Sequence, residues 1–213
     1  MLAPLLAAIV SAIFAGFVLY QYRAHRRAYQ LMWGIGLAFF AIAAFAGYLA
    51  RSGGATAGEY ALFYLFGAIL NVAWLGLGTL YLLTPRQWAN AALVVVLALS
   101  VAGVYAVLSA PIDLAAVADN GKGFPEGSLP RILAAIGSGA GSIILIGGAL
   151  YSAGIFAWKR HNGRRAAANV IIALGVLIVA AGGTTALFTG AAGLVEITNL
   201  VGVSVMFAGF LLA

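Results

Sequence analysis

Charge is scarce in this chain. Only 8% of its 213 residues are Asp, Glu, Lys or Arg, whereas 64% are hydrophobic. A soluble domain carries about a quarter charged residues, because its surface must be wetted. So little charge excludes a monomeric water-soluble domain, and the sequence predicts an all-α integral membrane protein.

Cysteine is absent altogether, which excludes disulfides, thiol catalysis and iron–sulfur ligation by cysteine. The two histidines, His25 and His161, lie in basic segments, so they do not form a haem-binding pair inside an apolar stretch. The sequence contains no cluster of His, Asp and Glu typical of a metal site. We therefore expect no cofactor, no metal and no enzymatic activity. The basic residues are scattered over short segments, so we also expect no nucleic-acid partner.

The few charges leave seven long uncharged stretches. A helix needs about 20 apolar residues to cross the hydrocarbon core, and within lipid it satisfies its own backbone hydrogen bonds. The sequence therefore predicts one transmembrane domain over residues 1–213, with the segment from Pro111 to Pro130 as its longest loop. The expected helices span residues 2–22, 29–50, 60–83, 88–110, 132–158, 166–188 and 195–213. No basic residue precedes the first stretch, which favours a helix over a cleaved signal peptide.

Basic residues are concentrated in alternate connections. The connections after the first, third and fifth helices hold eight of the eleven: Arg23, Arg26, Arg27, Arg86, Lys159, Arg160, Arg164 and Arg165. All five acidic residues lie in or beside the other connections. Because Lys and Arg favour the cytoplasmic side, we predict that the N-terminus is outside and the C-terminus inside, with anionic lipids as partners of the basic side. The composition, rich in Ala, Gly and Arg but poor in Lys, indicates a prokaryotic plasma membrane.

Two segments resemble each other at an offset of 138 residues. Residues 15–28 read AGFVLYQYRAHRRA and residues 153–166 read AGIFAWKRHNGRRA. This match predicts a parallel repeat of three helices, one linker helix and three helices. That plan resembles the SWEET sugar transporters and related vitamin transporters in the order of its helices. The prolines of this chain lie at helix ends or in loops, however, whereas SWEET proteins carry prolines within helices. The seven-helix plan also resembles microbial rhodopsins, but the last helix has no lysine to hold retinal.

The third expected helix carries the most distinctive polar residues. Gly67, Asn71, Trp74 and Gly78 follow one another at spacings that place them on one helix face. An unpaired amide such as that of Asn71 is costly at mid-membrane. Either Asn71 and Trp74 line a pocket for a neutral or aromatic-stacking ligand, or Asn71 hydrogen-bonds a neighbouring helix that the glycines allow to approach.

Small residues and acids supply the other candidates. The glycine-rich segment 137–142, and Gly182 and Gly183 before Thr184 and Thr185, are typical either of close helix packing or of a broken helix that exposes backbone groups to a ligand. Glu59 and Glu196 lie near the starts of two helices. They either bind a cation or a basic group, with Thr198 and Asn199 assisting Glu196, or cap their own helices.

These patterns predict a polytopic membrane protein that transports or binds a small neutral or lipophilic ligand. The alternative is a non-transporting sensor or an accessory subunit, associated with other copies of itself or with another membrane protein. The candidate ligand-binding residues are Glu59, Asn71, Trp74, Thr184, Thr185, Glu196 and Asn199.

Overall fold

The computed structural model describes residues 2–189 and 192–213, and its long elements are helices. Within these residues, seven helices are long and apolar enough to cross a membrane, which confirms the expected number. Several begin before the expected residue, because Arg86, Arg131 and Arg164 are accommodated in or next to the first helical turn. The elements are α1 (Ala3–His25), α2 (Ala28–Gly53), α3 (Ala57–Leu62), η1 (Phe63–Leu70), α4 (Asn71–Leu83), α5 (Arg86–Ser109), α6 (Leu114–Asn120), α7 (Leu129–Gly154), η2 (Ile155–Lys159), α8 (Gly163–Thr189) and α9 (Ala192–Leu212).

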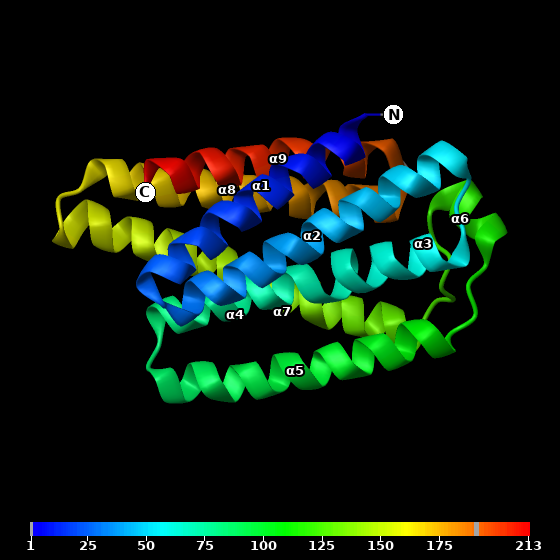
Figure 1. Ribbon diagram of the computed structural model, residues 1–213, viewed down its shortest axis with the longest axis horizontal. Helices are drawn as coiled ribbons and strands as arrows, with labels where there is room; N and C mark the ends of the chain where they lie inside the picture. Colours follow the sequence, from blue (N-terminus) through cyan, green and yellow to red (C-terminus); the bar gives the residue numbers. More distant parts are fainter. Residues whose placement is uncertain (1, 190–191) are drawn as a thin grey trace.

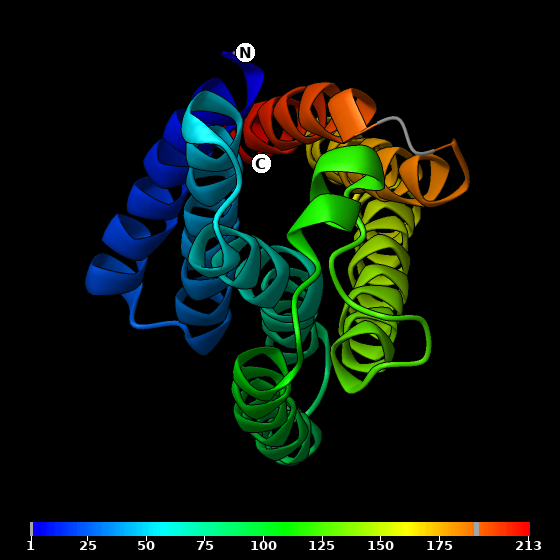
Figure 2. The same ribbon diagram turned by 90° about the vertical axis from the view of Figure 1, so that its right-hand side faces the viewer.

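Six of the seven spans form a closed ring. Helix α1 packs on α2, α2 on the continuous α3–η1–α4 helix, α4 on α7, α7 on α8, α8 on α9, and α9 returns to α1. The long helices run side by side in Figure 1, and Figure 2 shows the ring along its axis. Helix α5 stands outside the ring, where it packs on η1, α4 and α7.

The two ends of the ring carry opposite charge. Helices α1, α4 and α9 and the α7–η2 helix end where α2, α5 and α8 begin (Figure 1). This end, called the basic end below, holds the eight basic residues named above and none of the five acids. The opposite end, called the acidic end, holds all five acids together with Arg51, Lys122 and Arg131. Which end faces the cytoplasm stays a prediction.

A π-helical segment interrupts the third span near its middle. Helix η1 covers eight residues, longer than the single-turn π-bulges that are usual in proteins. Side chains at its edge bind backbone groups: the Asn71 Oδ1 accepts from the Val72 N–H, and the Ser138 hydroxyl of α7 donates to the Ala68 carbonyl at 2.5 Å. The irregular backbone is thereby tied to its own helix and to α7.

Glycines bring α4 and α7 into direct backbone contact, and we call this contact the glycine seam. A Cβ atom built on Gly141 would lie 2.5 Å from the Val72 carbonyl oxygen, and one on Gly76 would lie 3.1 Å from the Cα of Gly141. A Cβ on Gly137 would collide with the Ile69 carbonyl. Because α7 continues as one α-helix through residues 137–142, the packing interpretation of this segment is correct and the broken-helix interpretation is wrong.

The connection between α5 and α7 contains a helix that the sequence analysis does not predict. The Asp113 carboxylate begins α6 by accepting from the Ala115 and Ala116 N–H groups at 3.0 and 3.1 Å. Such N-capping satisfies backbone donors that a short helix leaves free. The expected twenty-residue loop is therefore partly structured.

The same connection folds back onto the third span. Phe124 is only 2% exposed, and its ring centroid lies 5.4 Å from that of Tyr60 and 4.9 Å from that of Tyr64. The Tyr60 hydroxyl accepts from the Gly123 N–H at 2.9 Å and donates to the Gly121 carbonyl at 3.4 Å. Burial of one aromatic ring and two hydrogen bonds thus fix the loop over the acidic end.

Candidate functional site

A cavity of about 60 Å³ lies inside the ring. All six ring helices contribute to its wall. The contributions are Phe14 and Val18 from α1, Trp33 and Leu37 from α2, Leu75, Thr79 and Leu82 from α4, Leu145, Gly148, Ala149 and Ser152 from α7, Asn169 and Ile172 from α8, and Met206 and Phe210 from α9. These residues lie late in α1, α4, α7 and α9 and early in α2 and α8, so the cavity occupies the half of the ring nearer the basic end.

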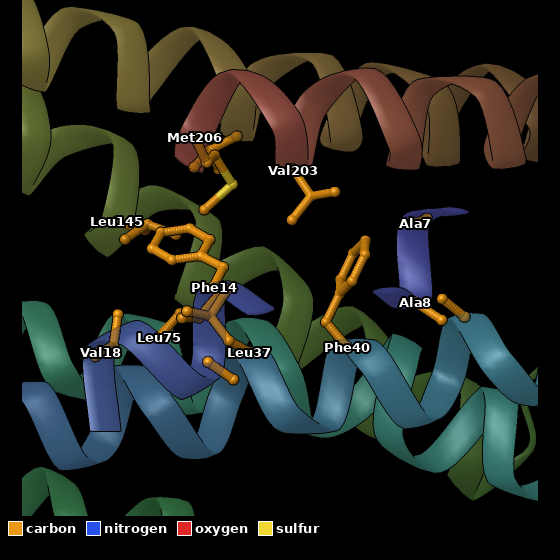
Figure 3. Close-up of a cluster of buried hydrophobic side chains, with 13 residues drawn as sticks. Ala7, Ala8, Phe14, Val18, Leu37, Phe40, Leu75, Leu145, Val203 and Met206 are labelled. Atoms are coloured by element: carbon orange, nitrogen blue, oxygen red, sulfur yellow. The ribbon is translucent and has the colours of Figure 1, made fainter. Parts of the chain in front are cut away.

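The wall towards the middle of the membrane is apolar. Phe14, Leu145 and Met206 come from three helices and point towards one another (Figure 3). The Phe14 ring also lies 4.8 Å from the ring of Phe207 and 5.1 Å from that of Phe210, centroid to centroid. This part of the cavity offers dispersion contacts and no hydrogen-bonding side chain.

Polar side chains line the wall nearer the basic end. The Asn169 amide nitrogen donates to the Arg165 carbonyl at 2.8 Å, which fixes that side chain on α8. The Thr79 hydroxyl and the Trp33 Nε1 both donate to the Leu75 carbonyl, at 3.2 and 3.1 Å. Ser152 adds a hydroxyl that is buried at 7% exposure. The cavity is therefore mainly apolar, with a few polar side chains on the side nearer the basic end.

The volume limits what the cavity can hold. An apolar cavity of about 150 Å³ accepts benzene, and one water needs roughly 10–15 Å³. At about 60 Å³, this cavity fits a few waters or part of a narrow hydrocarbon chain. A bulkier group requires movement of side chains such as Met206, whose unbranched thioether adapts its shape readily.

The structure places Asn71 and Trp74 away from this cavity. Asn71 is 3% exposed, and its side-chain oxygen is engaged by the Val72 N–H. The Trp74 Nε1 donates to the Ser100 hydroxyl of α5 at 3.3 Å, and its ring meets Phe39 edge-on at 6.0 Å. Neither residue lines the cavity. The Trp74 contacts match the packing interpretation, whereas the Asn71 hydrogen bond stays within its own helix. Ligand contact by either residue stays a prediction.

The two glycines on the same expected face pack against α2. A Cβ on Gly67 would lie 3.1 Å from the Cβ of Ala43, and one on Gly78 would collide with the Trp33 ring. Because Gly78 has no Cβ atom, the Trp33 ring can pack against α4 beside the cavity. The polar face expected on the third helix lies in the contact between α2 and α4.

Glu59 and Glu196 are engaged in separate contacts at the acidic end. Thr56 and Glu59 form a capping box, in which the Glu59 carboxylate accepts from the Thr56 N–H at 2.9 Å and the Thr56 hydroxyl accepts from the Glu59 N–H at 3.3 Å. This matches the capping alternative for Glu59. Glu196, in the first turns of α9, forms an ion pair with the Arg51 guanidinium at the end of α2.

The remaining candidates lie on α8 and α9. The Thr184 hydroxyl donates to the Ala180 carbonyl of its own helix at 2.9 Å, and both Thr184 and Thr185 are exposed. Asn199 is half-buried on α9. None of these three lines the cavity.

The sequence analysis missed the cavity residues because they come from six different helices. Their polar members share one feature that the sequence does show. Thr79, Ser152 and Asn169 each lie within about two helical turns of a basic connection. Polar residues at that depth would have been a better starting point than Asn71, which stands apart from any charge.

No protein-family model, curated protein or solved structure matches this chain. Among residues 2–189 and 192–213, no group of three or more His, Asp or Glu residues is placed to hold a metal ion. The candidate site is therefore defined by the geometry and chemistry of the cavity.

Proposed function

We propose that the protein binds a small lipophilic molecule inside its helix ring, as a membrane transporter or a ligand-binding membrane protein. The observation that carries this proposal is the cavity, to which all six ring helices contribute. A void inside a packed bundle deprives its lining of dispersion contacts, and a bound apolar group restores them. Because lipid gives helices no hydrophobic drive to associate, such contacts matter more here than in a soluble core.

The shape and chemistry of the wall favour a slender ligand. The volume of about 60 Å³ suits a narrow chain better than a ring system. Phe14, Leu145 and Met206 would contact the chain, while Ser152 and Asn169 would face its polar end. Such a ligand would lie along the ring axis, with its polar group towards the basic end.

The proposal includes a membrane arrangement. Helices α1–α4 and α7–α9 each supply three spans to the ring, and α5 stands outside it. This division supports a duplicated three-helix unit with α5 as the linker that keeps the two units parallel. The eight uncompensated basic residues support a cytoplasmic basic end, in a prokaryotic plasma membrane.

Tryptophan fluorescence offers a direct test, because Trp33 lines the cavity. We would replace Trp74, Trp88 and Trp158 by Phe and titrate the detergent-solubilised protein with dodecanol brominated at the chain end. Bromine quenches tryptophan on contact, so the proposal expects saturable quenching of Trp33.

Two substitutions on α7 separate cavity binding from partition into detergent. Ala149→Leu fills the cavity wall and should remove the saturable component. Gly147→Leu adds the same side chain to the same helix where a Cβ meets no atom within 4 Å, so quenching should be unchanged. Ser152→Leu provides a second filled cavity if Ala149→Leu does not fold. Quenching that never saturates, or that both folded variants retain, would refute the proposal.

Helix α5 supports the alternative of an accessory or self-associating subunit. Val101, Tyr105 and Leu108 are 72%, 69% and 76% exposed and form an apolar stripe along α5. Because the chain has no cysteine, Val101→Cys gives a unique cross-linking site. Efficient disulfide dimers in membranes from Val101→Cys but not from Ile143→Cys, which is 75% exposed on α7, would favour self-association through α5.

A further inference from the structure

Two arginines at the basic end stand over aromatic rings one helical turn beyond the cavity. On α8, Arg165 precedes the cavity residue Asn169 by four positions. Its guanidinium carbon lies 5.6 Å from the centroid of Phe156, and Phe156 follows the cavity residue Ser152 by four positions. This arginine–aromatic pair therefore joins η2 and α8 one helical turn beyond the cavity.

A second pair occurs at the end of α1. The Arg26 guanidinium carbon lies 5.8 Å from the centroid of Tyr22, and Tyr22 follows the cavity residue Val18 by four positions. Both distances are within the range of a cation–π interaction. We call Arg26, Tyr22, Phe156 and Arg165 the basic rim.

No ion pair joins the basic rim to an Asp or Glu side chain among residues 2–189 and 192–213. All five acids belong to the acidic end, and both ion pairs that the structure shows among its described residues, Arg51–Glu196 and Arg131–Glu126, lie there. The bias of arginine towards the cytoplasm accounts for the side on which these residues lie. It does not explain why these guanidinium groups lie over aromatic rings one helical turn beyond the cavity.

We propose that the site takes a single-chain amphiphile with an anionic head group, either a carboxylate or a phosphate monoester. This inference rests on the proposed function. The hydrocarbon chain lies in the cavity against Phe14, Leu145 and Met206, and the head group meets Arg165 at the basic rim. The planar guanidinium matches both head groups, because its fork of N–H donors binds carboxylate and phosphate oxygens in pairs.

The test compares three probes on the variant that retains Trp33 as its only tryptophan. They are chain-end-brominated dodecanoate, the corresponding dodecyl phosphate, and the uncharged dodecanol, each titrated in neutral detergent at low salt. We expect at least one anionic probe to bind about tenfold more tightly than the alcohol, the scale of one charge-assisted hydrogen bond. Salt near 1 M should reduce this preference, because it shortens the screening length to about 3 Å. Preference for the carboxylate indicates a fatty acid, and preference for the phosphate indicates a phospholipid-derived amphiphile.

Substitutions at the basic rim supply the control. Arg165→Gln should remove most of the anion preference and leave binding of the alcohol unchanged. Arg86→Gln removes the same charge at the same end, but from the start of α5, outside the ring, and should leave the preference intact. An equal loss in Arg86→Gln and Arg165→Gln would show a general surface potential and overturn the inference.

The outcomes also separate the two proposals. Saturable binding of the alcohol with no preference for either anion would overturn the anionic ligand and leave the lipophilic site standing. Absence of saturable quenching by all three probes would overturn both.

Discussion

The two ends of the helix ring are built in opposite ways. At the acidic end, the longest connection of the chain is folded and buries Phe124. An ion pair between Arg51 and Glu196 also joins α2 to α9 there. At the basic end, short turns join the helices, and a cavity remains among them. One end is held by specific contacts, while the other keeps a cavity next to arginines that form no ion pair with an Asp or Glu in the part of the chain that the structure describes. The difference indicates that access, if the cavity exchanges its ligand, is from the basic end.

The largest effect is expected where the closed end is anchored. Phe124→Ala removes a buried ring from contact with Tyr60 and Tyr64, and such truncations typically cost about 3–5 kcal/mol. Unfolding by SDS titration should show the loss, and limited proteolysis should cut within residues 110–128. Leu114→Ala in the same loop, where Leu114 is 42% exposed, is the control. Equal stability of the two variants would contradict the anchoring role of Phe124.

The glycine seam lies between the two ends of the ring. Substitutions in it test how closely α4 and α7 pack. Gly141→Ala places a methyl group against the Val72 carbonyl, and such overpacking costs about 1–3 kcal/mol. Gly139→Ala meets no atom within 4 Å and should gain up to about 1 kcal/mol from helix propensity. Unfolding free energies of the two variants should therefore move in opposite directions. A common shift would mean that α7 does not lie against α4 as described.

A smaller change removes the hydrogen bonds of the loop but keeps its aromatic packing. Tyr60→Phe deprives the buried Gly123 N–H of its acceptor, which costs about 1–2 kcal/mol. Tyr64→Phe retains the ring contact with Phe124 and should cost less. Hydrogen exchange of the Gly123 amide is the local readout: it should accelerate in Tyr60→Phe only. Quenching of Trp33 by the chain-end probes should stay unchanged, because the cavity lies at the other end.

The smallest effect is expected for the ion pair between α2 and α9. The side chains of Arg51 and Glu196 are 42% and 20% exposed, so solvent screens their attraction. A double-mutant cycle with Arg51→Gln and Glu196→Gln should give a coupling of about 0.2–1 kcal/mol that decreases with salt. A coupling above that range would mean that the pair is shielded from water and closes the acidic end more firmly than its exposure suggests.

The sequence predicts the spans well because charge spacing is a property of each segment by itself. A residue such as Arg86 or Arg131 marks a helix end wherever the helix packs. Phe124 and the cavity residues are different, because their roles depend on which segments meet. Nothing in the local sequence shows that Phe124 reaches Tyr60, or that Gly78 makes room for Trp33. The π-helical stretch at residues 63–70 is likewise set by contacts with its neighbours, including the bond from Ser138.

Asn71 shows where reasoning from polarity alone stops. A buried amide needs hydrogen-bond partners, and this requirement follows from the sequence alone. The sequence could not tell whether the partner is a ligand or the backbone of the next residue, and the structure shows the Val72 N–H in that place.

The closure of the ring by α9 on α1 has a consequence for biosynthesis. Helix α9, which packs on α1, is synthesised after the other five helices of the ring. Until α9 enters the membrane, the α1 flank that carries Phe14 lacks Phe207 and Phe210 and must face lipid or a chaperone. A nascent chain stalled before residue 192 would therefore carry an open ring, which gives membrane quality control a surface by which to recognise it.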